Sequence, residues 1–215
     1  MIFPMKSWMV WPKSANNNPC RTRWSVSKDI DPRSICAILN VRSVYFRSVD
    51  GENLIILAID PGIAITGFGI IESNAGITSY KDFGSINTAA GLAPAQRLNI
   101  IFREITELID KHKPDEMAVE KLFFNANVNT AMSVGQAKGV IMLAAARRNL
   151  SVFEYTPLQV KQAVAGYGRA EKRQIQQMVK MILKLSEIPK PDDAADALAL
   201  AICHANSKKM ESLTR

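Results

Sequence analysis

The chain has 215 residues, enough for one sizeable domain, and its 47% hydrophobic and 22% charged residues are ordinary for a globular protein. Its longest apolar run, Leu54 to Ile59, is far shorter than the roughly 20 residues that span a bilayer. Its three cysteines are too scattered for a disulfide framework or a zinc site, which favours a reducing, cytoplasmic compartment. The net charge of +7 favours a polyanionic partner such as nucleic acid, although a protein that is simply basic explains the charge equally well.

The first 53 residues lack sustained periodicity and lead into a turn-forming cluster at 50–53. We therefore divide the chain into an N-terminal extension (1–53), a domain (54–206) and a C-terminal tail (207–215). The extension could be an organellar transit peptide, a disordered DNA-binding arm, or upstream sequence translated from an over-extended start. We favour the third hypothesis, because no methionine lies between Met9 and Met117 and a non-standard start at Val49 would suit the domain. A native intact mass that corresponds to a chain beginning at Met1 would refute it.

From Leu54 onward, apolar periodicity predicts a regular order of elements. The apolar run that ends at Asp60 is typical of a central buried strand. The expected strands are 54–60, 67–72, 78–86, 117–119 and 152–155, and the expected helices are 94–111, 127–149, one opened by Pro157, 170–185 and 192–205. This order predicts an α/β fold with a mixed five-stranded sheet flanked by helices. The many small residues in 127–149 favour close approach of another helix or of a second subunit.

Two acidic residues close predicted strands. Asp60 ends the first strand, where ligands and catalytic groups gather in open α/β sheets. An Asp that merely initiates the following Pro-Gly turn is the competing interpretation, and for Asp60 alone it is the stronger one. Glu120 ends a second apolar strand and precedes two phenylalanines, and its alternative is a solvated strand end beside Lys121.

A second acidic pair lies near the start of the last predicted helix. Asp193 and Asp196 are three residues apart, a spacing that puts both carboxylates on one helix face. The helix dipole favours negative charge in the first turn, which explains Asp192 well and Asp193 in part. It does not explain Asp196, which lies among alanines and leucines, where an unpaired carboxylate is costly unless it faces a cation or water.

The chemistry of these four groups points to hard cations. Magnesium prefers carboxylate oxygens, and paired ions roughly 3.5–4 Å apart can clamp the attacking and leaving oxygens of a phosphodiester displacement. Histidine is scarce, and neither His112 nor His204 lies where a zinc ligand or general base is expected. We interpret Cys203-His204 as ordinary packing.

Four stretches of the domain together resemble the RuvC-type Holliday junction resolvases. They are LAIDPGIAITGFGII, VEKLFFNANVNTAMSVGQAKGV, VFEYTPLQVKQAVAGYGRAEKRQI and DDAADALALAICHA, in order from Leu54 to His204. The first is a weak signal alone, whereas the later three in sequence are specific. The resemblance implies a ribonuclease H-like fold and a homodimer that nicks two strands of a four-way junction symmetrically in recombination and DNA repair. Residues 1–53 have no counterpart in that family.

The resemblance also implies an acidic tetrad that holds magnesium, or manganese in its place, with two ions expected in each active site. Its members in this sequence are Asp60, Glu120, Asp193 and Asp196. None is substituted, so an active enzyme is implied.

Further residues are expected to contact DNA. By resemblance, Phe123 stacks on bases at the opened crossover, and Lys161 and Lys172 act in DNA binding and cleavage. From the residues alone, Lys138 and Arg169 add positive charge that could contact phosphates, although a lysine on a solvated face is the usual alternative. The implied partners are four-way junction DNA and the RuvA-RuvB branch-migration complex.

Three rival functions share features with this sequence. An actin-like kinase or ATPase also begins with D-x-G and T-G, but its fold needs a second, duplicated half. Only about 160 residues remain here, which leaves no room for that half. A ribonuclease H-like nuclease on another nucleic acid would cleave an RNA–DNA hybrid rather than a four-way junction. A non-catalytic junction-binding protein would not need four intact carboxylates.

Overall fold

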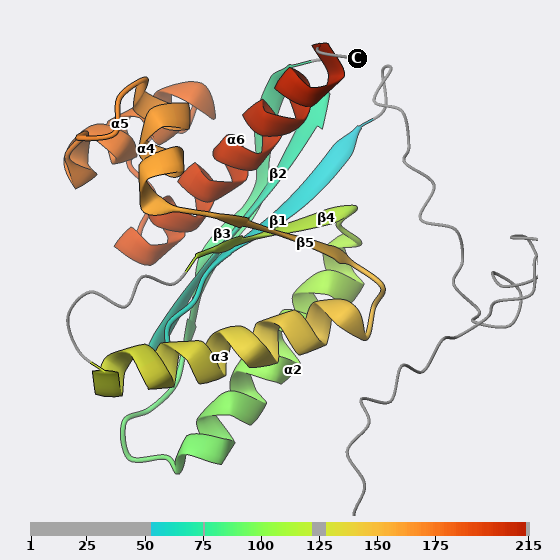
Figure 1. Ribbon diagram of the computed structural model, residues 1–215, viewed down its shortest axis with the longest axis vertical. Helices are drawn as coiled ribbons and strands as arrows, with labels where there is room; N and C mark the ends of the chain where they lie inside the picture. The colour runs from blue at the N-terminus through green and yellow to red at the C-terminus, as the bar shows by residue number, and fades with distance from the viewer. Residues whose placement is uncertain (1–52, 75, 122–127, 214–215) are drawn as a thin grey trace, which may run out of the picture. The chain divides into compact units, whose positions relative to one another are not determined.

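The computed structural model describes residues 53–74, 76–121 and 128–213. This part of the chain forms a five-stranded sheet in the order β3-β2-β1-β4-β5, with helices on both faces (Figure 1). The strands are β1 (Leu54–Asp60), β2 (Ile65–Asn74), β3 (Ile77–Asn87), β4 (Glu116–Glu120) and β5 (Ser151–Tyr155). The helices are α2 (Pro94–His112), α3 (Val128–Ala146), α4 (Pro157–Ala165), α5 (Lys172–Ile182) and α6 (Asp192–Leu213).

The sheet is mixed, as the order of elements predicted. β1 pairs antiparallel with β2 and β2 with β3, whereas β1–β4 and β4–β5 are parallel. The predicted apolar run therefore occupies the middle of the sheet, and Ile56 to Ile59 are completely buried. A parallel neighbour makes the carboxyl ends of β1 and β4 lie side by side.

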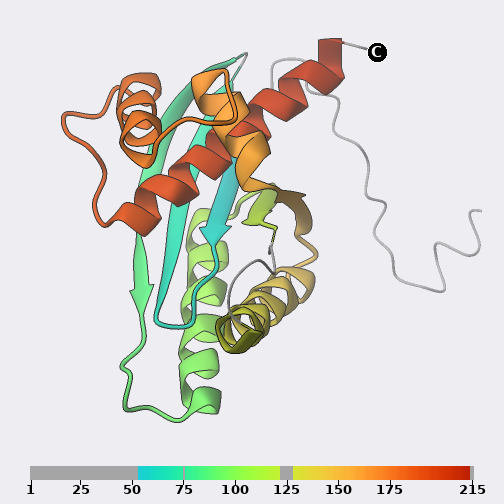
Figure 2. The same cartoon turned by 60° about the vertical axis from the view of Figure 1, so that its left-hand side comes forward.

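The alternation of side chains assigns each strand residue to one of two cores. Ile56, Ala58 and Ala118 pack with α4, α5 and α6 on one face. Leu57 and Val119 pack with α2 and α3 on the other. Figure 2 shows the same division, with α6 crossing one face of the sheet. Because side chains two apart share a face, Asp60 and Glu120 continue the rows that face α6.

Most predicted boundaries agree with the structure within a few residues, and the helix ends differ most. The last helix does not stop at Ala205 but continues to Leu213, so most of the residues assigned to a tail are helical. Lys208, in this added part of the helix, forms an ion pair with Glu116 and so ties it to β4. Conversely, α5 is shorter than predicted and begins only after a capping box at Glu171.

No helix in the described ranges is long and apolar enough to cross a membrane. The predicted extension, except for its last residue, Asn53, lies outside the described residues.

Candidate active site

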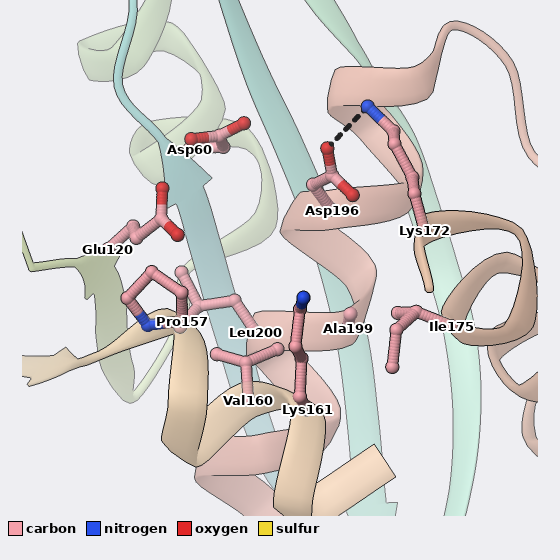
Figure 3. Close-up of a pocket in the computed structure, with 10 residues that line it drawn as sticks. All are labelled: Asp60, Glu120, Pro157, Val160, Lys161, Lys172, Ile175, Asp196, Ala199 and Leu200. Carbon is pink, nitrogen blue, oxygen red and sulfur yellow. Dashed lines mark ion pairs between the residues drawn. The ribbon is translucent and has the colours of Figure 1, made fainter. Parts of the chain in front are cut away.

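Asp60 and Glu120 occupy adjacent strand ends. The ladder between β1 and β4 has its last pair at Ile59 and Val119, one residue before each carboxylate. The two side chains therefore leave the sheet next to one another, and they share a hydrogen bond. Figure 3 shows both carboxyl groups at the rim of one pocket.

Helix α6 brings Asp196 to the same pocket from across the face of the sheet. Two glycines of β2 allow this close approach. A Cβ built on Gly67 would lie 2.1 Å from the Asp193 carbonyl oxygen, and one on Gly69 would lie 2.9 Å from the Leu198 backbone nitrogen. Gly67 is also the register partner of Asp60, so the first turn of α6 crosses the sheet directly beside β1.

The pocket combines acidic, basic and apolar groups from three helices and two strand ends. Its lining residues are Asp60, Glu120, Pro157, Val160, Lys161, Lys172, Ile175, Asp196, Ala199 and Leu200. Three members of the predicted tetrad are among them. Asp193 is not, but its charge acts on Asp60 electrostatically. The structure therefore brings the predicted carboxylates together on one face.

Burial and mutual repulsion make these carboxyl groups hard to ionise. Burial, the Glu120 carboxylate and the two α6 carboxylates raise the pKa of Asp60 from 3.8 to about 8. Burial also raises the pKa of Glu120 and of Asp196. Full ionisation of such a site is unfavourable near neutral pH, and a bound cation would offset the repulsion between the carboxylates.

Lys172 provides a cation within the protein itself. Its ammonium lies 3.0 Å from Asp196 Oδ2 and 3.4 Å from Asp192 Oδ2. Burial alone would lower the pKa of Lys172, but these carboxylates raise it above its ordinary value. The ion pair in Figure 3 thus neutralises one corner of the acidic cluster.

The donor set suits a hard divalent cation. All four groups offer carboxylate oxygens, which magnesium and manganese prefer. Within the residues that the structure describes, no three His, Cys, Asp or Glu side chains form a preassembled ligand group. Binding would therefore require the carboxylates to turn inward and Lys172 to release Asp196.

The predicted DNA-contacting residues divide into three groups. Lys161 and Lys172 line the pocket, and Arg169 is exposed on the segment between α4 and α5. Phe123 lies outside the described residues. Lys138 differs from the prediction, because it is buried with only 8% of its surface exposed and forms an ion pair with Glu154. Its ammonium is therefore engaged by a carboxylate inside the protein.

Sequence reasoning missed the glycines and a buried polar network. Gly67 and Gly69 belong to the stretch that is a weak signal alone, and their spacing of two residues on the α6 face of a strand is the signal that could have identified them. His204 was interpreted as ordinary packing. It is completely buried, but it is hydrogen-bonded at 2.7 Å to both the Tyr155 hydroxyl and Glu116 Oε2. This network ties α6 to β4 and β5.

A mixed sheet of this order, with carboxylates from β1, β4 and the last helix around one pocket, defines the class of ribonuclease H-like nucleases. The family described as "Crossover junction endodeoxyribonuclease RuvC" matches residues 56–204. This chain belongs to that family. It is therefore an endodeoxyribonuclease, an enzyme that hydrolyses phosphodiester bonds within DNA.

Relatives of the same description are similar over nearly their whole length. The "Crossover junction endodeoxyribonuclease RuvC" of Halothermothrix orenii is 57% identical over 157 residues, which cover 73% of this chain and 95% of the relative. That of Heliobacterium modesticaldum is 58% identical over 154 residues, which cover 72% and 95%. About a quarter of this chain falls outside both matches.

Solved structures give the same result. Thermus thermophilus RuvC is 34% identical with a TM-score of 0.69, covering 74% of this chain and 98% of that one. The same protein "in complex with Holliday junction substrate" gives a TM-score of 0.71 at 34% identity, covering 74% and 97%. The yeast mitochondrial Holliday junction resolvase, at 13% identity, has a TM-score of 0.56 and covers 85% and 91%, which shows a shared fold.

Proposed function

We propose that this chain resolves four-way DNA junctions by paired, symmetric nicks during recombination and repair. The observation that carries the chemistry is the convergence of Asp60, Glu120 and Asp196 on one pocket that lysines also line. The choice of substrate is supported by the structural neighbour from Thermus thermophilus, which is in complex with Holliday junction substrate.

The acidic groups are assigned the role of holding the metal. Asp60, Glu120, Asp193 and Asp196 would hold magnesium, or manganese in its place, and four carboxylates suffice for two ions. Bound cations would supply Lewis-acid stabilisation of the charge that develops on the phosphate and would activate water. The apolar side of the pocket, including Val160 and Leu200, would limit bulk water and strengthen these interactions.

The basic residues are assigned the role of holding DNA. Lys161 extends from α4 into the pocket (Figure 3), where its ammonium can contact the scissile phosphate. Arg169, exposed nearby along the chain, would add a contact to a neighbouring phosphate. Phe123 remains a prediction for base stacking at the crossover.

A homodimer would supply the two active sites that paired nicks need. An outward face of α3 supports this proposal, because Met132, Met142 and Leu143 expose 61%, 41% and 53% of their surfaces. Gly139 lies between them with nothing within 4 Å of a Cβ built on it, which leaves room for a second helix.

The RuvA-RuvB complex is a further proposed partner, and a cytoplasmic location follows from a chromosomal substrate.

Cleavage of a synthetic four-way junction tests the proposal. The full chain and a chain trimmed to Val49–Arg215 are each incubated with the junction, a linear duplex and an RNA–DNA hybrid. We expect magnesium-dependent nicks at symmetric positions of the junction alone. Preferred cleavage of the hybrid would support the ribonuclease alternative, and tight junction binding without nicks in magnesium or manganese would support a non-catalytic binding protein.

Lys172→Met is expected to separate metal binding from cleavage. Removing the ammonium leaves Asp196 unpaired, so the acidic cluster should bind manganese more tightly, by roughly fivefold if about 1 kcal/mol of Coulomb attraction is gained. Cleavage should fall, because Lys172 can no longer contact a phosphate. Titration of manganese without DNA, followed by electron paramagnetic resonance, measures the first effect. Lys180→Met, in the last turn of the same helix, is the control for loss of one charge. Unchanged or weaker manganese binding would contradict the competition between Lys172 and metal.

A further inference from the structure

Lys138 is a buried lysine on the face of the sheet opposite the pocket. It lies in α3, which packs on the side of Leu57 and Val119, and its side chain is only 10% exposed. Two groups contact its ammonium. Lys138 forms an ion pair with Glu154 of β5, and it donates a hydrogen bond of 3.2 Å to the backbone carbonyl oxygen of Glu120.

Burying the Lys138 ammonium costs solvation free energy. A charge taken out of water loses several kcal/mol of solvation, which a partner carboxylate and hydrogen bonds only offset. Helix α3 otherwise contributes apolar residues to this core, such as Ala137 and Ile141. A lysine that served only solubility or DNA binding would lie on the exposed face of the helix.

The hydrogen bond from Lys138 to the Glu120 carbonyl oxygen lies at a strand end of the pocket, which points to a role for the ammonium there. Glu120 is the last residue of β4, and β1 stops pairing with β4 one residue earlier, at Val119. On that side the ladder no longer fixes the Glu120 backbone. Its register partner on the other side is Tyr155, the residue after Glu154. Lys138 therefore joins α3, β5 and the end of β4, where pairing with β1 has stopped, through a single ammonium group.

We propose that Lys138 is a positioning residue for Glu120. By holding the Glu120 carbonyl oxygen and Glu154 together, it fixes the direction in which the Glu120 side chain leaves the strand toward the pocket. It acts from the far face of the sheet and touches neither DNA nor metal. The proposal rests on the proposed role of Glu120 in cleavage, and it replaces the direct DNA contact predicted for Lys138.

The experiment compares four variants of the full chain: Lys138→Met, Lys138→Arg, Glu120→Gln and Lys121→Met. Methionine keeps the length and apolar stem of lysine but removes the donor, whereas arginine keeps a charged donor. Lys121 is an exposed lysine beside Glu120, so its replacement controls for the loss of one charge near the same strand end. Each variant is assayed for junction affinity without magnesium, for kcat and KM with magnesium, and for thermal unfolding.

Lys138→Met is expected to lower kcat by roughly 10- to 100-fold, because displacements of about 1 Å in a catalytic group cost this much. Junction affinity and KM should stay within about twofold of the unaltered chain, as a residue remote from DNA predicts. Lys138→Arg should recover most of kcat, and Lys121→Met should match the unaltered chain. Assays at a temperature at which unfolding curves show every variant folded exclude simple loss of stability.

Two results would overturn the inference. One is wild-type kcat in Lys138→Met, which would make the hydrogen bond irrelevant to cleavage. The other is a loss that lies in junction affinity rather than in kcat, which would return Lys138 to DNA binding. Glu120→Gln separates this inference from the proposed function, since full cleavage by that variant would refute the role of Glu120 itself.

Discussion

Asp60→Asn is expected to abolish junction cleavage while leaving junction binding intact. The amide keeps the size of the side chain but removes a negative oxygen from the centre of the acidic cluster, between Glu120 and the α6 carboxylates. A loss on the order of 10³-fold in kcat is expected when a group that stabilises developing charge is removed. Single-turnover cleavage and gel-shift binding on the same junction measure the two effects. Cleavage within a few fold of the unaltered chain would remove Asp60 from the active site.

The same substitution is expected to stabilise the metal-free protein above neutral pH. The pKa of Asp60 is about 8 in the folded chain, against 3.8 ordinarily, so the folded state holds this proton more tightly than the unfolded state. The contribution of Asp60 to stability is fully present below about pH 4 and is lost as the pH rises toward 8. Asparagine carries no charge at any pH and avoids that loss. Each pKa unit corresponds to about 1.4 kcal/mol, so a gain of a few kcal/mol at pH 8 is expected.

Urea unfolding at pH 5 and pH 8, with and without magnesium, measures this gain. The advantage of Asp60→Asn should be larger at pH 8 than at pH 5. It should shrink when magnesium is added, because a cation bound by the unaltered chain stabilises only the folded state. Glu107→Gln, at an exposed carboxylate of α2, is the control. An equal or lower stability of Asp60→Asn at pH 8 without metal would contradict the electrostatic description of the site.

The sequence predicted the strand ends of the site well because the signals there are local. An apolar run that ends in Asp, and a second that ends in Glu, give both the buried strand and the place of the carboxylate. The three-residue spacing of Asp193 and Asp196 likewise follows from helix geometry alone. That these groups meet on one face depends on the parallel pairing of β1 with β4 and on the crossing of α6. Local patterns do not specify either of these contacts, and the family resemblance supplied them.

The features that sequence reasoning missed depend on contacts between distant segments. In the sequence, Lys138 cannot be told from a lysine that contacts DNA. Its internal position is evident only from the structure, where its ammonium meets Glu154 and the Glu120 carbonyl oxygen. The helix beyond Ala205 is tied to β4 by Lys208, which reaches Glu116, 92 residues away along the chain. The need for glycine at 67 appears only when α6 lies on the sheet.

Gly67→Ala is therefore expected to impair cleavage although it changes no chemical group of the site. The added methyl carbon would lie 2.1 Å from the Asp193 carbonyl oxygen and 3.0 Å from its Cβ, distances that require the helix or the strand to move. A displacement of about 1 Å in the first turn of α6 would move Asp193 and Asp196 away from Asp60, and a loss of roughly 10²-fold in kcat is expected. Overpacking of this kind should also cost about 1–3 kcal/mol of stability.

Two further glycine variants separate displacement of α6 from loss of stability. Gly84→Ala would place a Cβ 3.0 Å from the Phe68 ring, away from α6, and should destabilise the chain while cleavage of the folded protein stays close to normal. Gly91→Ala meets no atom within 4 Å and should change neither property. Cleavage rates are compared at a temperature at which circular dichroism shows all three variants folded. If Gly67→Ala then cleaves as fast as Gly84→Ala, the close approach of α6 to β2 does not set the geometry of the acidic cluster, and the carboxylates must be positioned by other contacts, such as the His204 network.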